Sequence, residues 1–382
     1  MYITETRATE KEARDTDKKR GVRAGALRAV REFLNSRSFY VLQVLIACFF
    51  VFIKQEVLGA ICFVALIAAI LAICDDIRAT TLPFLIICTI TTNRYNSYNL
   101  YIGYIKYVPV VLVALIYHFV IYHKSFAFGE SAKGIFAAGL AISLGGLGRF
   151  SLSDYAYGGY YFFGLGFGML FAYALMRSEF YDDKKEDRYK FAFMMTAYGM
   201  LCGFMIANGY YKLYIEKSIV NLYPEGFSRN NLSTLLMFVM PFPLYLAKRK
   251  PAAAFLTVLV LAFLALTRSR GGFLFGCIEF AVCAVFWIFS GKTKKGRKIR
   301  LYVCLGALAI GVCVMLPALI KWILPRFDVN VKNETRYKMI WEAVDKFFKR
   351  PISGYGLLDS EILYESVRKK GSLTWYHMMV PQ

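Results

Sequence analysis

Long apolar runs, repeated along most of the chain, are the feature that most restricts its fold. Runs of about 15 to 24 residues are typical of helices that cross a membrane, where each backbone polar group must find its partner within the helix. With 58% hydrophobic and only 19% charged residues, the composition is unlike that of a soluble domain. We predict an all-α, polytopic transmembrane helical bundle with eleven runs, at about residues 38–53, 57–74, 80–92, 101–121, 134–148, 157–176, 189–207, 232–247, 251–267, 273–290 and 301–324.

The third and fifth runs are short enough to be tilted or re-entrant. Another apolar run starts at Met378, close to Gln382. We therefore expect one or two further helices beyond the printed sequence.

The positive charge of the chain points to membrane lipid as its partner. The formal net charge is +21, and most of the excess lies in residues 1–36 and in short loops between apolar runs. Cytoplasmic loops that face anionic lipid show this pattern, so we do not expect nucleic-acid binding.

The same loops orient the chain. Alternate loops carry the cations, among them Arg78, residues 177–188 and Lys248-Arg249-Lys250. The positive-inside rule therefore predicts a cytoplasmic N-terminus. The predicted divisions are a basic cytoplasmic tail (1–36), a transmembrane domain (37–324) and an extracytoplasmic loop (325–382).

Cysteine and histidine give no sign of a metal centre. The nine cysteines lie in or beside apolar runs without a C-x-x-C pair, and the chain has only three histidines. We interpret the cysteines as small buried hydrophobes and expect neither a disulfide framework nor a zinc site.

Three polar segments share the predicted outer face: residues 207–231, the short link 267–272 and the tail 325–382. In the tail, Ile340, Val344, Phe347 and Phe348 are spaced i, i+4, i+7 and i+8. This spacing predicts an amphipathic helix that lies at the membrane interface. The convergence of the three segments is the main functional clue.

The link Thr267-Arg268-Ser269-Arg270-Gly271-Gly272 has the residues of a phosphate site. Gly271 and Gly272 let the backbone approach a bound group, and a helix N-terminus beside the Arg270 guanidinium favours an anion. For Arg268, an interfacial anchor is an equal alternative.

Further candidates lie outside this link. Arg336, on the first turn of the amphipathic helix, could complete a clamp on a diphosphate or remain a solvated interfacial residue. His377 could act as a base near neutral pH or be structural. Lys106 is interpreted as an aromatic-belt anchor with a secondary attraction for anionic lipid. Glu279, about 13 Å along its helix, is expected to pair with a polar neighbour.

Taken together, these residues resemble the O-antigen ligase and O-antigen polymerase superfamily. The resemblance rests on the Ser269-Arg270-Gly271 step that opens a helix. It also rests on Arg336-x4-Trp341 followed by Pro351-x2-Gly354-x-Gly356, and on His377 at the end of the long outer loop. A weaker element is the segment Gly226-Phe-Ser-Arg229-Asn-Asn231, and the whole set spans about residues 226 to 382.

The resemblance implies a metal-independent, cofactor-free glycosyltransferase in the bacterial cytoplasmic membrane. It would move glycan from an undecaprenyl-diphosphate-linked donor to the hydroxyl of a saccharide or lipid-glycan acceptor on the outer face. Arg270 and Arg336 would hold the diphosphate, and His377 would orient or deprotonate the acceptor. The further substrate-binding candidates are Arg268, Arg229, Gly271, Gly272 and Lys106.

Ligase and polymerase share these motifs, so the acceptor stays open. The alternatives are a lipid-linked oligosaccharide flippase or other transporter and a non-catalytic envelope scaffold. A transporter would be expected to show two similar halves with broken helices at matching positions, and no such repeat is visible.

Overall fold

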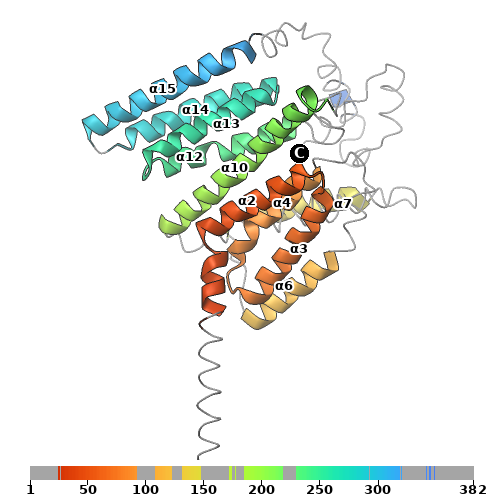
Figure 1. Ribbon diagram of the computed structural model, residues 1–382. Helices are drawn as coiled ribbons and strands as arrows, with labels where there is room; N and C mark the ends of the chain where they lie inside the picture. The colour runs from red at the N-terminus through yellow and green to blue at the C-terminus, as the bar shows by residue number, and fades with distance from the viewer. Residues whose placement is uncertain are drawn as a thin grey trace, which may run out of the picture.

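The computed structural model describes most of the helical part of the chain. The described residues are 25, 27–92, 108–122, 131–147, 172–173, 177, 185–217, 229–291, 293–318, 320, 341, 344, 345 and 348. Within them the regular structure is helical throughout, as predicted (Figure 1). In chain order the elements are α2 (Arg37–Phe52), α3 (Glu56–Ile73), the 3-10 turn η1 (Ile77–Thr80), α4 (Thr81–Thr92), α6 (Val108–Tyr122), α7 (Ala132–Leu147), α10 (Lys185–Tyr214), α11 (Arg229–Val239), α12 (Pro241–Leu246), η3 (Pro251–Ala253), α13 (Ala254–Leu266), α14 (Arg270–Phe289) and α15 (Lys294–Ala318).

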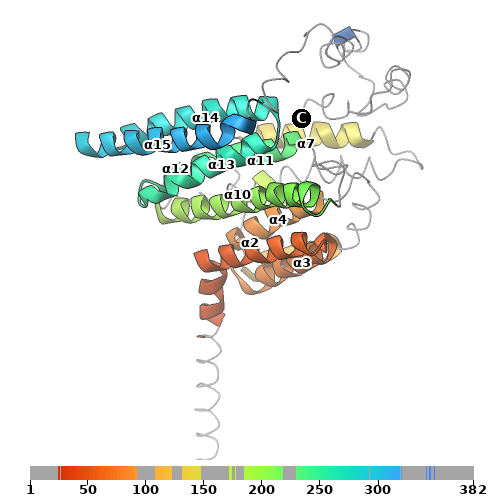
Figure 2. The same cartoon turned by 45° about the horizontal axis from the view of Figure 1, so that its top comes forward.

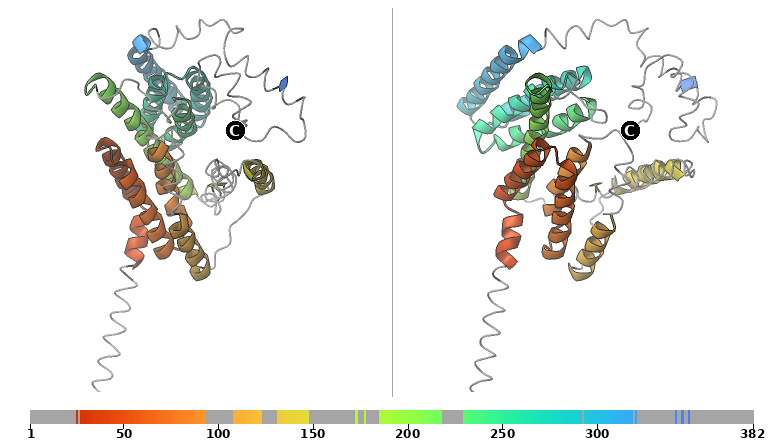
Figure 3. Two further views of the ribbon diagram at one scale, coloured as in Figure 1. Left: turned by 90° about the vertical axis from the view of Figure 1, so that its right-hand side faces the viewer. Right: turned by 45° about the vertical axis from the view of Figure 1, so that its right-hand side comes forward.

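Helix α10 is the centre of the bundle. It packs against α2 and α4 on one side and against α11, α12 and α13 on the other (Figure 2, Figure 3). Its residues Met194, Met195 and Leu201 are almost fully buried in one apolar core with side chains of these neighbours. At Gly203 an added Cβ would lie 2.0 Å from the ring of Phe263. The absence of a side chain there lets α13 approach α10 closely.

Ion pairs at both ends of α2 and α10 show that these two helices run in the same direction. Arg37 pairs with Glu186 at one end, at 2.6 Å, and Lys54 pairs with Glu216 at the other, at 2.9 Å. Arg249 also reaches Glu186, at 2.7 Å. We call the end of the bundle that holds Glu186 the Arg78 end, and the end that holds Glu216 the Ser269 end. The cationic loops at Arg78 and Lys248–Lys250 gather at the first, in agreement with the predicted alternation.

Among the residues that the structure describes, three helices have the length and composition to cross a bilayer: Glu56–Ile73, Lys185–Tyr214 and Gly271–Phe289. The bent pair Leu27–Leu34 and Arg37–Phe52, with 65° between its helices, gives a fourth when it is taken as one span. Most other predicted runs correspond to shorter helices, and the run 301–324 overlaps the 25-residue helix α15. Most of the run 157–176 lies outside the described residues.

Large apolar side chains cover the outward faces of several helices. Phe275, Phe286 and Phe289 of α14 are 60, 73 and 66% exposed, and Val113 and Ile116 of α6 are more than 60% exposed. Continuous apolar faces of this kind suit contact with lipid acyl chains rather than water. They fit a multi-pass membrane protein.

The structure differs from the sequence prediction in three local features. Residues Leu27–Leu34, assigned to the basic tail, form a helix, and Leu34 is buried against Phe39 and Ile70. Helix α10 runs to Tyr214, well beyond the predicted end at 207. The run 232–247 is broken between α11 and α12, because Pro241 has no N–H to continue the α11 ladder.

Candidate active site

The link between α13 and α14 is a tight turn fixed by its own side chains. Thr267 Oγ1 donates to the carbonyl of Leu264 at 2.6 Å and accepts the N–H of Ser269 at 3.2 Å. Arg268 takes the left-handed conformation, with φ of 58°, which costs on the order of 1–3 kcal/mol for a residue with a side chain. Ser269 then caps α14 by accepting the N–H of Gly272 at 3.3 Å. The predicted helix start at the Ser269-Arg270 step is therefore confirmed.

The first amides of α14 point out of the helix. The first intrahelical bond joins the N–H of Phe273 to the carbonyl of Ser269 at 2.9 Å. The N–H groups of Arg270 and Gly271 precede it and have no acceptor within the helix. Gly271 is exposed, and an added Cβ would meet nothing within 4 Å. This end of α14 is open to a bound group, as the sequence predicted for Gly271.

Two helix N-termini lie side by side at this point. The Ser269 hydroxyl donates to Asn230 Oδ1 at 3.1 Å, which joins the start of α14 to the start of α11. One turn further, a Cβ added to Gly272 would lie 2.5 Å from both Cβ and Oγ of Ser233. Gly272 thus has a packing role, because only a glycine lets α11 and α14 come this close.

Each of these helices begins with an arginine. Arg229 is the first residue of α11 and Arg270 is the first residue of α14. Helix N-termini carry partial positive charge, so the backbone alone concentrates positive charge where these two helix starts meet. The arrangement is suited to binding an anion with several oxygens.

Arg268 is tied to the end of α10. Its Nε and one terminal nitrogen donate to the hydroxyls of Tyr210 and Tyr214, each at 3.1 Å. Tyr210 in turn donates to the carbonyl of Leu266 at 2.8 Å, and the two tyrosine rings stack with centroids 5.9 Å apart. These bonds make Arg268 a tether between the α13–α14 link and α10.

Sequence reasoning placed Tyr210 in a long outer loop and did not single out Tyr214. Their spacing of four residues, directly after an apolar run, was the available signal, because it puts both rings on one face of a continued helix.

The remaining predicted site residues are not brought together by the described part of the chain. Arg336, His377 and Lys106 lie outside the described residues. The described residues of the predicted amphipathic helix, namely Trp341, Val344, Asp345 and Phe348, are helical. Their spacing of i, i+3, i+4 and i+7 places them on one face of a helix.

Glu279 departs from its predicted role. It is half-buried near the middle of α14, and among the described residues it makes no hydrogen bond or ion pair. The expected polar neighbour is therefore missing there, because the residues around it on α14 are apolar or cysteine.

The nine cysteines are free thiols. Cys74, Cys202 and Cys304 are buried, whereas Cys62, Cys88 and Cys313 are exposed. The interpretation as buried hydrophobes thus holds for the first group only. Within the described ranges no three metal-ligating side chains come together.

Comparison with known proteins addresses the C-terminal third of the chain. Residues 255–378 match the family model described as O-antigen ligase. The predicted superfamily resemblance is confirmed. This O-antigen ligase match includes the α13–α14 link and extends over the positions of Arg336 and His377, but it leaves out the segment around Arg229. No curated protein and no solved structure matched the chain.

The structure connects the part of the chain inside the O-antigen ligase match to a part outside it. Ser269 lies within the matched residues and its partner Asn230 precedes them. The candidate site therefore includes the start of α11, which the sequence identified only as a weaker element.

Proposed function

We propose that the chain is a membrane glycosyltransferase of the O-antigen ligase and polymerase type. It would use an undecaprenyl-diphosphate-linked glycan as donor and a saccharide or lipid-glycan hydroxyl as acceptor. The observation that carries the proposal is the pairing of the α11 and α14 N-termini, opened by Arg229 and Arg270, at the edge of the O-antigen ligase match.

The chemistry of the leaving group explains why such a site is useful. A diphosphate that leaves a sugar carbon gains negative charge as the bond breaks, so it needs fixed positive groups more than a proton donor. The amides of Arg270 and Gly271, which have no acceptor within α14, would supply such groups together with the two arginines. In this proposal Arg336 completes the clamp from the amphipathic helix.

The acceptor step needs a group that removes a proton. The acceptor oxygen forms a bond to the anomeric carbon while the bond from that carbon to the diphosphate oxygen breaks. The proton of the acceptor hydroxyl passes to His377, and undecaprenyl diphosphate leaves with the electron pair. The exposed Gly271 and the tether Arg268 would lie beside the diphosphate, and Lys106 would attract the anionic lipid.

We further propose that the Ser269 end faces outward from the cytoplasmic membrane, with residues 1–36 in the cytoplasm and residues 325–382 outside. The gathering of the cationic loops at the Arg78 end supports this orientation, because cytoplasmic loops carry most of the Lys and Arg residues. A cysteine placed at Ser353 should react with an impermeant thiol reagent in whole cells, and one at Thr293 should react only after the cells are opened. The unmodified protein, treated in the same way, is the control for labelling of the native thiols. The reverse labelling pattern would exclude an outward-facing site.

The function is tested with membranes that contain the intact protein and the lipid-linked glycan of the same bacterium. A transferase releases undecaprenyl diphosphate in step with the appearance of longer or transferred glycan. A flippase moves the intact lipid-linked glycan across the membrane without this release, and a scaffold does neither. Product without released undecaprenyl diphosphate would contradict the proposal.

A further inference from the structure

A polar cleft of about 470 Å³ lies at the Arg78 end, far from the candidate active site. The N-terminal helix, the start of α2, the η1 turn and the first turns of α10 form its walls. The side chains that line it include four cations and three carboxylates. They are Arg31, Glu32, Asn35, Ser36, Arg37, Tyr40, Asp76, Arg78, Asp187 and Lys190.

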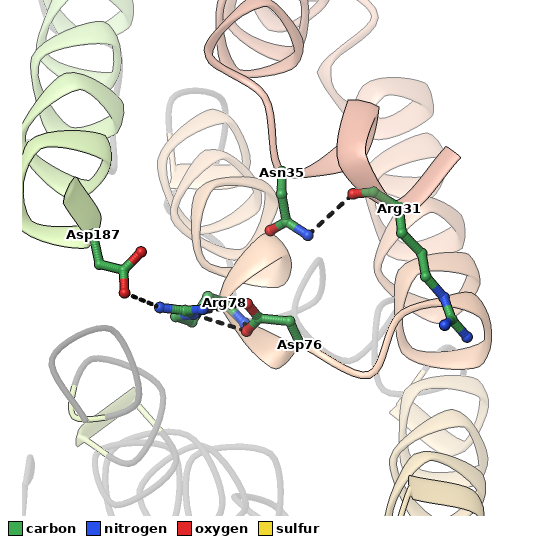
Figure 4. A network of polar contacts seen from close by, with 5 residues as sticks. All are labelled: Arg31, Asn35, Asp76, Arg78 and Asp187. Carbon is green, nitrogen blue, oxygen red and sulfur yellow. Dashed lines mark hydrogen bonds and ion pairs between the residues drawn. The ribbon is translucent and has the colours of Figure 1, made fainter. Parts of the chain in front are cut away.

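One cation of the cleft is held between two carboxylates. Arg78 bonds Asp76 at 2.7 Å and Asp187 at 3.0 Å (Figure 4). Asp76 also accepts the backbone N–H of Arg78 at 3.0 Å. These contacts hold Arg78 in place and occupy the carboxylates of both Asp76 and Asp187.

The third carboxylate is also engaged. Glu32 pairs with Arg28, one turn earlier on the N-terminal helix, at 3.0 Å. The carboxylates of the cleft therefore all have cationic partners, and they are poorly placed to attract a cationic ligand.

Two cations of the cleft make no hydrogen bond or ion pair with a carboxylate in the described part of the chain. Arg31 uses Nε on the carbonyl of Ile73 at 2.9 Å and one terminal nitrogen on the Tyr122 hydroxyl at 3.4 Å. Lys190, half-buried, makes no hydrogen bond with any described residue. Glu186, on the same helix as Lys190, is already bonded by Arg37 and Arg249. The cleft therefore carries positive charge that its own carboxylates do not neutralise.

The cleft lies beside a helix with the character of a membrane interface. The N-terminal helix meets α2 at 65°, as the bend at the foot of α2 in Figure 1 shows. Its side chains Leu27, Val30 and Phe33 are 42, 44 and 48% exposed. A short amphipathic helix that turns away from a span and exposes apolar residues lies along the headgroup layer. A cleft beside such a helix would lie at the level of lipid phosphates.

We propose that this cleft binds the phosphate of an anionic phospholipid headgroup, with Arg31 and Lys190 as its charged partners. The alternative source of the same chemistry is a soluble phosphate. A zwitterionic headgroup fits less well, because its amine would find no unpaired carboxylate in the cleft. The proposal is independent of the glycan chemistry at the opposite end.

The test measures binding to the purified full-length chain in a neutral detergent by native mass spectrometry. The probes are phosphatidylglycerol, phosphatidylcholine, glycerol phosphate and inorganic phosphate. We expect phosphatidylglycerol to bind at least tenfold more tightly than phosphatidylcholine. Lys190→Gln, which breaks no bond seen in the fold, should weaken phosphatidylglycerol binding at least fivefold, and addition of Arg31→Gln should weaken it further.

Lys185→Gln is the matched control for Lys190→Gln, since Lys185 is exposed on the same helix outside the cleft and its loss leaves the carboxylates of the cleft paired. An equal loss in this control would overturn the proposal in favour of general surface charge. Equal binding of glycerol phosphate or inorganic phosphate would overturn the lipid assignment in favour of a soluble anion. Unchanged binding in Lys190→Gln would overturn the role of the cleft.

Discussion

The two ends of the bundle hold their arginines by different chemistry. At the Arg78 end, carboxylates hold three arginines: Arg78 bonds Asp76 and Asp187, and Glu186 bridges Arg37 and Arg249. Arg31, Arg297 and Arg300 at this end bond carbonyls and hydroxyls instead. At the Ser269 end, two tyrosine hydroxyls hold Arg268, and Arg270 follows a serine cap. A carboxylate fixes a cation and cancels its charge, whereas a hydroxyl fixes it and leaves the charge in place. The tyrosines at the Ser269 end thus leave the charge of Arg268 in place, whereas the Arg78 network neutralises the charge of Arg78.

This contrast predicts that variants at the two ends fail in different ways. Changes at the Ser269 end should lower the rate of transfer in a folded protein. Changes in the Arg78 network should lower stability and leave the rate of each folded molecule unchanged.

The largest effect is expected at His377, on the predicted outer face. His377→Gln keeps a hydrogen-bonding group but cannot accept a proton near neutral pH, so the rate should fall about 10²-fold or more. The wild-type rate should rise with pH through roughly 6 to 7 and then level off, and the variant should lose this rise. Initial rates across pH measure both effects. A near-normal rate with an unchanged profile would remove the base assignment, and Glu365→Gln would be the next variant to assay.

The second effect concerns stability at the opposite end. Arg78→Met leaves Asp76 and Asp187 without their shared cation, and their side chains are only 22 and 16% exposed. We expect a loss of about 2 kcal/mol of unfolding free energy, measured as a lower unfolding midpoint in detergent. Arg28→Met, which breaks the exposed pair with Glu32, is the control and should change stability by less than about 0.5 kcal/mol. A slower transfer rate per folded Arg78→Met molecule would break the division between the two ends.

A third variant separates charge from geometry at the start of α14. Arg270→Lys keeps the positive charge but loses the planar guanidinium that engages two phosphate oxygens together. We expect the rate to fall at least tenfold, about 1.4 kcal/mol of transition-state stabilisation, with unchanged stability.

Arg268→Lys is the comparison for Arg270→Lys. It should affect the rate much less, because the bonds of Arg268 go to Tyr210 and Tyr214. Full activity in Arg270→Lys would reduce that residue to an interfacial anchor.

The smallest effect compares two serines at opposite ends of α14. Ser269→Ala removes the cap and the bond to Asn230, with a loss of about 1 kcal/mol of stability and a rate reduced a few-fold. Ser290→Ala removes a bond to the Trp287 carbonyl at the Arg78 end and should affect stability alone. Unfolding midpoints and initial rates of both variants decide the matter. Equal rates in the two would show that the α11–α14 junction does not position the site.

Much of this arrangement follows from local sequence patterns. The start of α14 was predictable because a serine followed by Arg270 and two glycines, just before an apolar run, gives both a cap and a helix. The alternation of cationic loops likewise predicted which helix ends gather together. Both inferences use residues close together in the chain.

The missed features depend on distant partners or on weak local signals. Nothing near Ser269 reveals that its hydroxyl meets Asn230, 39 residues earlier. The helix at Leu27–Leu34 was missed because its apolar positions Leu27, Val30 and Leu34, spaced i, i+3 and i+7, are diluted by charged neighbours. Its bend was equally hidden, because the angle to α2 is set by the packing of Leu34 against Phe39 and Ile70.

The contact of Gly272 with Ser233 imposes a one-sided limit on the candidate site. Backbone meets a short side chain there, so the separation of the two helix N-termini is set by atomic radii rather than by flexible groups. Glycine is already the smallest residue, and every substitution at position 272 adds atoms. Mutation at this position can widen the gap between Arg229 and Arg270 but cannot narrow it. In the proposed site, an anion bound between the two helix starts would therefore have a lower size limit set by the backbone, and variation at position 272 could only shift the fit toward larger groups.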